Sequence, residues 1–317
     1  MRICNIALFC FILHTPEVFG WGFAAHKQIN RHAVFTLPPA MFTFYKHYLA
    51  YITENAVNPD KRRYVVEGEA PKHYIDIDYY GDGACWEIPR YWHQAVEQYP
   101  EDTLLEHGIL PWHILRMKHA LTEAFRQKDG LQILKLSADI GHYLADANVP
   151  LHTSQNYDGQ LTNQHGIHGL WETRLPELFG KDYDFFIGQA VYVHNPQQRI
   201  WEAIIQAHSA VDSVLCLEKE LTSHFSPVKK YSFEQKGSTL RKVYAEAYAQ
   251  AYHLLLEGQV ERQMRASIKM IGDFWFTCWA DAGKPQLDEL LNSPLQEQQL
   301  QETLPEQTQL KVRTCGD

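Results

Sequence analysis

The stretch from Gly141 to Glu172 constrains this chain more than any other, because its histidines and carboxylates are spaced as in a metal site. His142 and Asp146 are four residues apart. Apolar residues recur at helical spacing from Leu131 to Ala147, so we expect both side chains to project from one face of a helix. Two ligands from a single helical turn fix part of a coordination sphere.

A second pair completes the pattern within the same stretch. His168 and Glu172 are also four residues apart, on a second predicted helix. His152 falls between the two pairs, just after Pro150 ends the first helix. Neutral imidazole and carboxylate are ligands that Zn²⁺ accepts in proteins. We therefore predict one metal site built from both pairs and His152.

Another pair of the same type supplies an internal comparison. His208 and Asp212 are four residues apart on a predicted helix, but no other cluster of ligand-type residues lies beside them in the sequence. A lone His-x-x-x-Asp is a weak motif. We interpret this pair as part of a solvated helix face.

The remaining composition indicates one exported domain. Residues 1–20 carry Arg2, an apolar run from Ile6 to Leu13, and small residues before position 21, as in a cleavable secretory signal. The apolar run is far shorter than the ~20 residues that span a bilayer. We expect a domain over 21–284 and a polar tail over 285–317, without a transmembrane anchor. The mature protein is then secreted or periplasmic, and monomeric.

Charge and cysteine content limit the possible partners. The formal net charge is −9, which does not favour long-range attraction of nucleic acid or of an anionic membrane. An anionic substrate would therefore need local positive charge, which bound metal can supply. Four cysteines follow the predicted signal, without metal-type spacing, and they can pair in an exported protein: Cys85, Cys216, Cys278 and Cys315.

The rest of the chain favours an all-α fold, a single-domain bundle of seven or more helices. Strand signals are almost absent, apart from a locally extended segment at 74–78. The Asn-Pro of NPDKRRY predicts a turn, and 230–238 is polar and predicted to be a loop. Helices are expected over these ranges: 22–37, 41–55, 86–99, 111–127, 131–147, 195–221, 240–257 and 260–281.

Several residues outside the central stretch carry two interpretations. After signal cleavage, the amine and carbonyl of Trp21 can chelate a metal, with His26 one helical turn further on, but an N-terminal Trp can equally be a packing residue. Asp60 is either a ligand or a cap, and Asp78 either functional or a solvated loop residue. The sequence alone leaves these alternatives open.

Taken together, these residues resemble the superfamily of trinuclear-zinc phosphoesterases, which contains bacterial phospholipase C and the single-strand-specific nucleases of fungi and plants. The resemblance covers residues 21–172, and the family's fold is a helical bundle with its zinc cluster in a cleft. The residues that match the ordered family pattern are Trp21, His26, Asp60, His73, His142, Asp146, His152, His168 and Glu172.

The resemblance implies three zinc ions per chain. The first would be held by Asp60, His73, His142 and Asp146. The second would take the amine and carbonyl of Trp21 with His26 and Asp146, which would bridge the two ions. A third would be bound by His152, His168 and Glu172, leaving an open position for water or substrate, as catalytic zinc does.

Features of both family branches are present. The opening WG-x-x-x-H and the motif HYID resemble the nucleases, in which Tyr74 would stack on a base and Asp76 would assist catalysis. Asp76 can orient the attacking water or accept its proton, or it can support His73 structurally. Asp60 is the second predicted catalytic carboxylate. The block HYLADANVPLH and the final Glu172 are closer to the phospholipases.

These implications lead to three functional hypotheses. The first is an exported zinc-dependent phosphodiesterase that acts on single-stranded nucleic acid or nucleotides. The alternative is a phospholipase C acting on phosphatidylcholine-type lipids, for which an exposed apolar rim is expected. The third is an exported zinc-binding protein without catalytic activity.

Overall fold

The computed structural model describes residues 22–236 and 239–291. Trp21, the predicted signal and most of the predicted tail lie outside this range. The described chain is built mainly of α-helices, which are α1 (Phe23–Val34), α2 (Pro39–His47), α3 (Leu49–Glu54), α4 (Asn58–Arg62), α5 (Ala84–Glu87), α6 (Trp92–Gln98), α7 (Glu101–His107), α8 (Leu110–Gln127), α9 (Gly130–Asp146), α10 (Ile167–Gly169), α11 (Leu175–Phe179), α12 (Pro196–His208), α13 (Val211–His224), α14 (Glu246–Leu255), α15 (Gln259–Asp281) and α16 (Asp288–Leu291).

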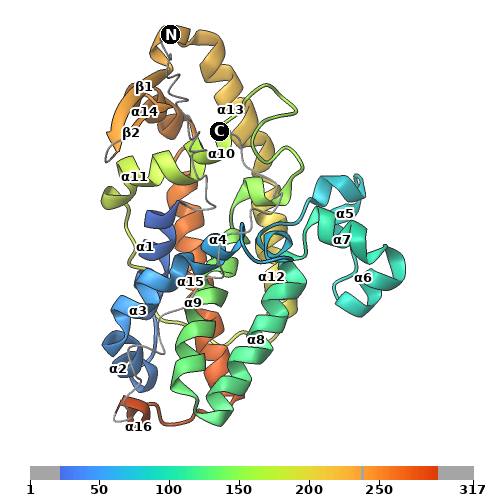
Figure 1. Ribbon diagram of the computed structural model, residues 1–317, viewed down its shortest axis with the longest axis vertical. Coiled ribbons are helices and arrows are strands. Elements are labelled where there is room, and N and C mark those ends of the chain that lie inside the picture. The colour runs from blue at the N-terminus through green and yellow to red at the C-terminus, as the bar shows by residue number, and fades with distance from the viewer. Residues whose placement is uncertain (1–21, 237–238, 292–317) are drawn as a thin grey trace, which may run out of the picture.

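The predicted helical bundle is confirmed. Helices α8, α9 and α15 lie side by side along the long axis of the molecule, with α1 against α9 and α15 and with α12 against α8 (Figure 1). Each presents an apolar face to the shared core, as amphipathic helices of a bundle do. None of the described helices is both long enough and apolar enough to cross a membrane.

Helix α15 forms the centre of the core, as its aromatic cluster predicts. Phe274, Trp275 and Cys278 are fully buried. The Trp275 ring stacks on Tyr45 with centroids 5.0 Å apart, and its indole N–H donates to the carbonyl of Ser137 in α9. Aromatic side chains bury large apolar areas, and this hydrogen bond satisfies the one polar group of the indole.

The first helix approaches α9 closely at a glycine. A Cβ atom on Gly141 would lie 2.3 Å from Oδ1 of Asn30 in α1, which is too close for any other residue. The Asn30 amide in turn donates to the carbonyl of Ala138. This contact brings α1 against the helical turn that carries His142.

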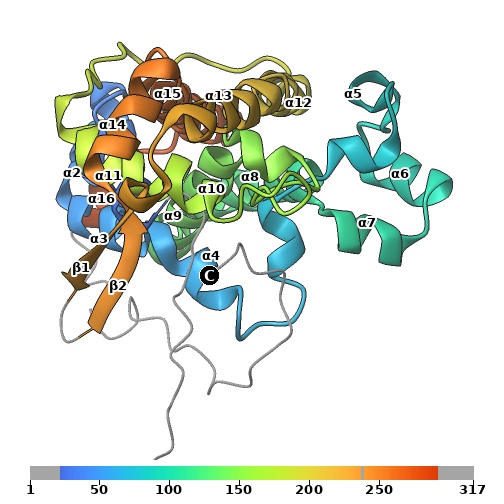
Figure 2. The ribbon, with the colours of Figure 1, turned by 90° about the horizontal axis from the view of Figure 1, so that it is seen from above.

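Short non-α turns carry several of the predicted ligands. The 3₁₀ turns near the site are η1 (Asn55–Val57), η2 (Ala70–His73), η3 (Ile77–Tyr80) and η4 (Pro150–Thr153), and η5 (Leu170–Arg174) is a π-helical turn. Helices α5, α6 and α7 project from one side of the bundle (Figure 2). A π-helical turn is uncommon in proteins and often occurs at functional sites.

The structure corrects several expected elements. Asn58 and Pro59 begin helix α4 rather than a turn, because proline fits the first turn of a helix. The helices expected over 41–55, 86–99 and 195–221 are each divided, into α2 and α3, into α5 and α6, and into α12 and α13. The segment at 74–78 is extended only at its start, since η3 begins at Ile77. The three described cysteines, Cys85, Cys216 and Cys278, are free thiols.

The largest correction concerns 230–257. The polar loop and the helix that were expected there are instead an antiparallel hairpin followed by α14, with strands β1 (Tyr231–Lys236) and β2 (Thr239–Tyr244). In β1, Tyr231 and Phe233 alternate with polar residues, which is a strand pattern, whereas β2, TLRKVY, shows no such alternation. A Gly-Ser pair at 237–238 separates them in the sequence, as in many hairpins.

Candidate metal centre

Asp146, in the last turn of α9, lies among four histidines. Its carboxylate oxygens are 3.4 Å from Nε2 of His26, 3.0 Å from Nδ1 of His73, 3.3 Å from Nε2 of His142 and 3.8 Å from Nδ1 of His152. All five side chains are at most 3% exposed. This central position is consistent with the bridging role that the family resemblance implies for Asp146.

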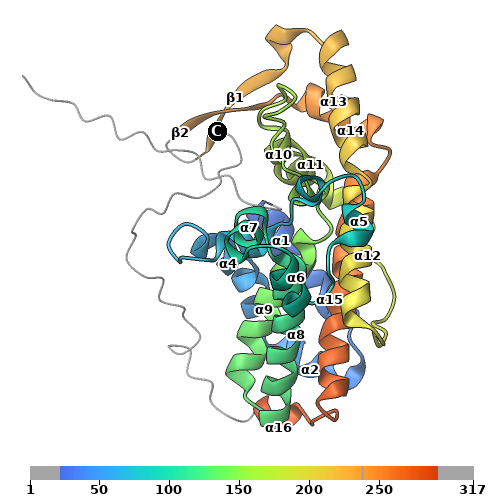
Figure 3. The same cartoon turned by 90° about the vertical axis from the view of Figure 1, so that its right-hand side faces the viewer.

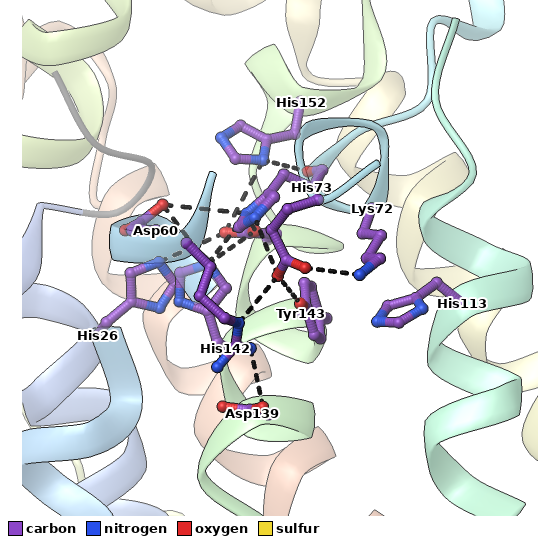
Figure 4. Close-up of polar contacts among 12 residues, drawn as sticks. His26, Asp60, Lys72, His73, His113, Asp139, His142, Tyr143 and His152 are labelled. Atoms are coloured by element: carbon purple, nitrogen blue, oxygen red, sulfur yellow. Dashed lines mark hydrogen bonds and ion pairs between the residues drawn. The ribbon is translucent and has the colours of Figure 1, made fainter. Parts of the chain in front are cut away.

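A first group of potential ligands gathers Asp60, His73 and His142 beside Asp146 (Figure 4). Oδ1 of Asp60, from α4, is 3.6 Å from Nε2 of His142 and 3.9 Å from Nδ1 of His73. The two imidazole nitrogens are 3.1 Å apart. Segments far apart in sequence, α4, η2 and α9, therefore bring their ligand atoms to one point.

A second group contains His26, His142 and Asp146. The rings of His26 and His142 stack with centroids 3.8 Å apart. Neither nitrogen of His26 has a hydrogen-bond partner, although the residue is fully buried. Gly22 donates its backbone N–H to the carbonyl of Glu172, so the described chain starts beside a ligand-bearing segment. Trp21 itself lies outside the described residues, and its predicted role stays a prediction.

The third group consists of His152, His168 and Glu172. Nε2 of His152 is 3.2 Å from Nε2 of His168 and 3.5 Å from Oε2 of Glu172. Nε2 of His168 is 2.8 Å from Oε1 of Glu172. The predicted pairing on one helix face holds, although the backbone between the two residues passes from α10 into the π-helical turn η5.

Backbone carbonyls orient three of the imidazole rings. Nδ1 of His142 donates to Ala56 O at 2.9 Å, and Nδ1 of His152 donates to His73 O at 2.6 Å. Nδ1 of His168 likewise donates to Tyr157 O at 2.9 Å. A carbonyl can only accept, so each Nδ1 carries the proton and each Nε2 keeps its lone pair for a metal. This is the usual arrangement around metal-binding histidines.

The protonation states also suit metal binding. Burial lowers the pKa of His26, and it lowers the pKa of His73 to about 3, so both rings are neutral near pH 7. Burial raises the pKa of Asp60 well above its usual range. Burial alone would also raise the pKa of Asp146 and of Glu172, but the neighbouring histidines hold both below their usual ranges.

The buried polar atoms of the three groups fit bound cations. Among the described residues, seven of the sixteen buried side-chain polar atoms that lack a hydrogen bond belong to four of these residues: His26, Asp60, Asp146 and Glu172. Such atoms are costly to bury without a partner. Tetrahedral zinc, with ligands at ~2.0–2.2 Å, keeps its ligand atoms roughly 3.3–3.5 Å apart. The spacings within the third group, 2.8 to 3.5 Å, are close to that value.

Glu69 lies behind the first group and was not expected from the sequence. Its Oε1 is 4.0 Å from Nε2 of His73, on the side of the ring away from Asp146. Tyr143 donates its hydroxyl to Glu69, and Arg62 and Lys72 form ion pairs with it. Burial would raise the pKa of Glu69, but these charges and hydrogen bonds hold it at about 2. A carboxylate that faces the outer nitrogen of a ligand histidine is a common support.

Arg63 is a second residue that sequence reasoning missed. It lies one helical turn after Asp60 and is 3% exposed. Burial raises the pKa of Asp60 and the charge of Arg63 partly opposes that rise, while at His73 the same charge adds to the lowering of the pKa by burial. The spacing of an acidic and a basic residue three apart was visible in NPDKRRY, but the predicted turn gave no reason to place both in the site.

Two predicted site residues lie in other surroundings. Tyr74 is 7% exposed, and its hydroxyl donates to the carbonyl of Glu106. Its backbone packs on Gly108, where a φ of 90° and a Cβ position 2.1 Å from Tyr74 O both require glycine. Asp76 is 3% exposed, and its Oδ2 is 3.3 Å from Nδ1 of His107. Neither residue is a member of the three potential ligand groups.

His208 and Asp212, the pair used for comparison, lie outside the three groups, but only Asp212 fits the interpretation as a solvated helix face. Asp212 is exposed. His208 is half-buried, and its Nδ1 is 3.0 Å from Thr153 O and 3.1 Å from Thr153 Oγ1. His208 therefore supports the segment that carries His152 instead of facing solvent. The lone motif indeed marks a contact and not a ligand pair.

Comparison with known proteins yields a likeness between structures. No family model matches the chain, and no curated protein sequence matches it. Among solved structures, the alpha toxin of Clostridium absonum matches 86% of the chain with a TM-score of 0.46 and 11% identity. The alpha-toxin of a Clostridium perfringens avian strain matches 86% with a TM-score of 0.47 and 12% identity. The alignment spans 66% of the length of each toxin chain. Neither match assigns a role to a residue of this protein.

Proposed function

We propose that the protein is a zinc-dependent phosphoric ester hydrolase with three metal positions. The observation that carries this proposal is the set of three buried His/Asp/Glu groups. Two of the groups share His142, and the third contains His152, which lies 3.8 Å from Asp146. A purely structural zinc site needs one closed set of four ligands. Three adjoining groups of metal ligands instead suit a substrate with several charged oxygens.

The division of labour follows from the donor sets. Asp60, His73, His142 and Asp146 would hold one ion, and His26 with Asp146 and the Trp21 terminus a second. His152, His168 and Glu172 would hold the third, with three protein ligands. Bound zinc ions neutralise a phosphodiester and activate water for attack on phosphorus.

The residues of the chain set the conditions for this chemistry. The carbonyls of Ala56, His73 and Tyr157 keep the three Nε2 atoms aimed at the site. Asp60 has two buried oxygens without hydrogen-bond partners, so it is held for a cation or for a proton. Asp76 is paired with His107. We therefore assign Asp76 a role in positioning segment 73–78, in preference to a role in proton transfer.

A phospholipid is the substrate class that we favour. The nucleic-acid hypothesis rested on Tyr74 as a stacking platform, and little of this ring is accessible. Apolar side chains are instead exposed on segments next to the third group. Leu161, 70% exposed, lies in the loop that joins His152 to His168. Tyr79, 45% exposed, follows Asp78, which accepts hydrogen bonds from Ser154 Oγ and from the backbone N–H after it.

A third exposed apolar side chain lies on a helix that contacts the turn of Tyr79. Trp86 is 79% exposed on α5, and α5 contacts η3, the turn that carries Tyr79. Together these features match the exposed apolar rim expected of a phospholipase C.

The test is to incubate purified protein with phosphatidylcholine, denatured DNA and RNA, each with and without a chelator. We expect release of diacylglycerol from phosphatidylcholine, loss of that activity with chelator, and its return when Zn²⁺ is added. The variant His73→Ala should be inactive. Cleavage of nucleic acid alone would contradict the choice of substrate. Protein that binds zinc but cleaves none of the three would be a non-catalytic zinc protein.

A further inference from the structure

The hairpin β1–β2 exposes apolar side chains away from the bundle. Register pairs Phe233 with Lys242 and Gln235 with Leu240, so Phe233 and Leu240 lie on the same face of the hairpin. Phe233 is 68% exposed and Leu240 is 66% exposed. Figure 3 shows the two strands projecting from the body of the molecule. Large apolar side chains exposed together on a projecting element often mark an interaction site.

The same hairpin is basic, in contrast to the rest of the chain. Over 231–244 its charged residues are three basic ones and a single acidic one, whereas the whole chain has a net charge of −9. The acidic residue, Glu234, is paired with Arg174. Arg241 and Lys242 are exposed. At physiological salt, charges act over ~8 Å, so a nearby surface responds to these residues and not to the distant acidic ones.

The base of the hairpin is firmly packed. Tyr231 and Tyr244 pack with ring centroids 4.9 Å apart, and Tyr244 stacks on Tyr248 of α14. Lys230 reaches Glu218 of α13 at 2.8 Å. The exposed part is therefore presented on a fixed support.

The hairpin is also attached to both sides of the third ligand group. Tyr244 donates its hydroxyl to the carbonyl of His165, three residues before His168. Arg174, two residues after Glu172, donates Nε–H to the carbonyl of Tyr244. Binding of the hairpin to a surface would thus fix the orientation of the third group relative to that surface.

We propose that the hairpin is a docking element for an anionic phospholipid surface. Phe233 and Leu240 enter the boundary between headgroups and acyl chains. Lys242, on the same face, and Arg241, on the opposite face across from Glu234, contact headgroup phosphates on either side. Apolar burial combined with basic residues is the usual basis of such interfacial binding. This inference deepens the proposed function, on which it rests for its purpose, by naming the surface on which the substrate is met.

The binding itself is tested by co-sedimentation with vesicles of phosphatidylcholine alone or mixed with phosphatidylglycerol. The parent protein should bind the mixed vesicles more tightly than vesicles of phosphatidylcholine alone, and this difference in affinity should decrease as the salt concentration is raised. Arg241→Ala with Lys242→Ala should weaken binding to mixed vesicles about 25-fold, since each basic residue contributes about fivefold. Phe233→Ser with Leu240→Ser should weaken binding to both kinds of vesicle. Unchanged binding in either double variant would overturn the proposal.

Matched variants elsewhere on the surface serve as controls. Lys181→Ala with Lys219→Ala removes two exposed charges, and Val96→Ser with Phe186→Ser removes two exposed apolar side chains. These four residues lie away from the hairpin in sequence, and their variants should bind as the parent does. An equal loss of vesicle binding in the control and hairpin variants would overturn the proposal. So would sedimentation of the protein alone that shows a dimer formed through the hairpin, if this dimer does not bind vesicles.

Hydrolysis of a soluble phosphocholine ester separates this inference from the proposed function. The hairpin variants should keep the parent's rate and thermal midpoint with that ester, because no hairpin residue belongs to the metal groups. Protein that binds anionic vesicles but hydrolyses nothing would refute the function and leave the docking surface standing. Protein that hydrolyses the soluble ester but binds no vesicles would refute the docking surface alone.

Discussion

Asp146 illustrates how much of the site depends on single residues. Four imidazoles within 3.0 to 3.8 Å surround its carboxylate in a fully buried position. Burial of a carboxylate without compensating charge is strongly unfavourable. A cation bound between Asp146 and the imidazole nitrogens around it would supply that compensating charge.

At the third group, His168→Ala and Glu172→Ala should each empty the same metal position. The two side chains face each other at 2.8 Å and share His152 as a neighbour. Anomalous scattering at the zinc edge from crystals of both variants checks this. Depletion of different positions in the two variants would show that the pairing is wrong.

His208→Ala is the matched control for these two variants. His208 contacts Thr153 but belongs to none of the ligand groups, so its removal should leave the zinc content unchanged. A large loss of zinc would identify His208 as a ligand.

Glu69→Gln should weaken metal binding at the first group without removing a ligand. Glu69 faces the outer nitrogen of His73 at 4.0 Å, and loss of such a partner typically lowers metal affinity about 10- to 100-fold. Competition with a chromogenic chelator measures the change. Glu67→Gln, at an exposed position nearby, is the control. Equal affinities in the parent and in Glu69→Gln would refute this positioning role.

At the scale of elements, periodicity located the long helices but not the short ones. The helices over 111–127, 131–147 and 260–281 match α8, α9 and α15 closely, because each has an apolar face and clear end signals. The hairpin at 231–244 was missed because its polar residues read as a loop. Its stability depends on contacts with α13 and α14, which the local sequence does not contain.

Glu218 joins these elements, and its variant Glu218→Gln should destabilise the fold. The buried carboxylate accepts from Lys230, Tyr248, Thr222 and Gln164. Hydrogen bonds to a charged group contribute about 1.5–3 kcal/mol each to stability, and we expect a loss of that order in the free energy of unfolding. Chemical denaturation at pH 7 measures it. A variant as stable as the parent would contradict this role.

The difference in the free energy of unfolding between the parent and Glu218→Gln should depend on pH. Burial raises the pKa of Glu218, but Lys230, Tyr248 and Gln164 lower it below its usual value overall. A depressed folded-state pKa gives stability that is present above the unfolded value of ~4.3 and is lost as pH falls through the folded pKa. The gap in stability should therefore narrow below about pH 4.3. A gap that widens on acidification would contradict the sign.

At the scale of the whole molecule, the sequence predicted the residues that the structure brings together in the three potential ligand groups, but not their surroundings. The i, i+4 pairs and the ordered family pattern were sufficient for eight of the residues, because ligand chemistry restricts both residue type and spacing. The support by Glu69 and Arg63 and the burial of Tyr74 depend on tertiary packing. That information is distributed over η2, α4 and α9, so no local motif could carry it.

We also predict that export and metal loading are linked at the N-terminus. Cleavage after Gly20 would free the amine of Trp21, and the adjoining Gly22 already bonds to the backbone of Glu172. An amide nitrogen is a poor ligand for zinc, so protein with one extra residue before Trp21 should lack about one zinc ion and most of its activity. Equal zinc contents and rates in the two forms would show that Trp21 only packs.

The zinc content of protein that begins at Trp21, purified without chelator, tests the central claim most directly. Three adjoining ligand groups, two of which share His142, predict three zinc ions per chain by elemental analysis. One zinc ion per chain, or none, would contradict the multi-metal site and the hydrolytic function built on it.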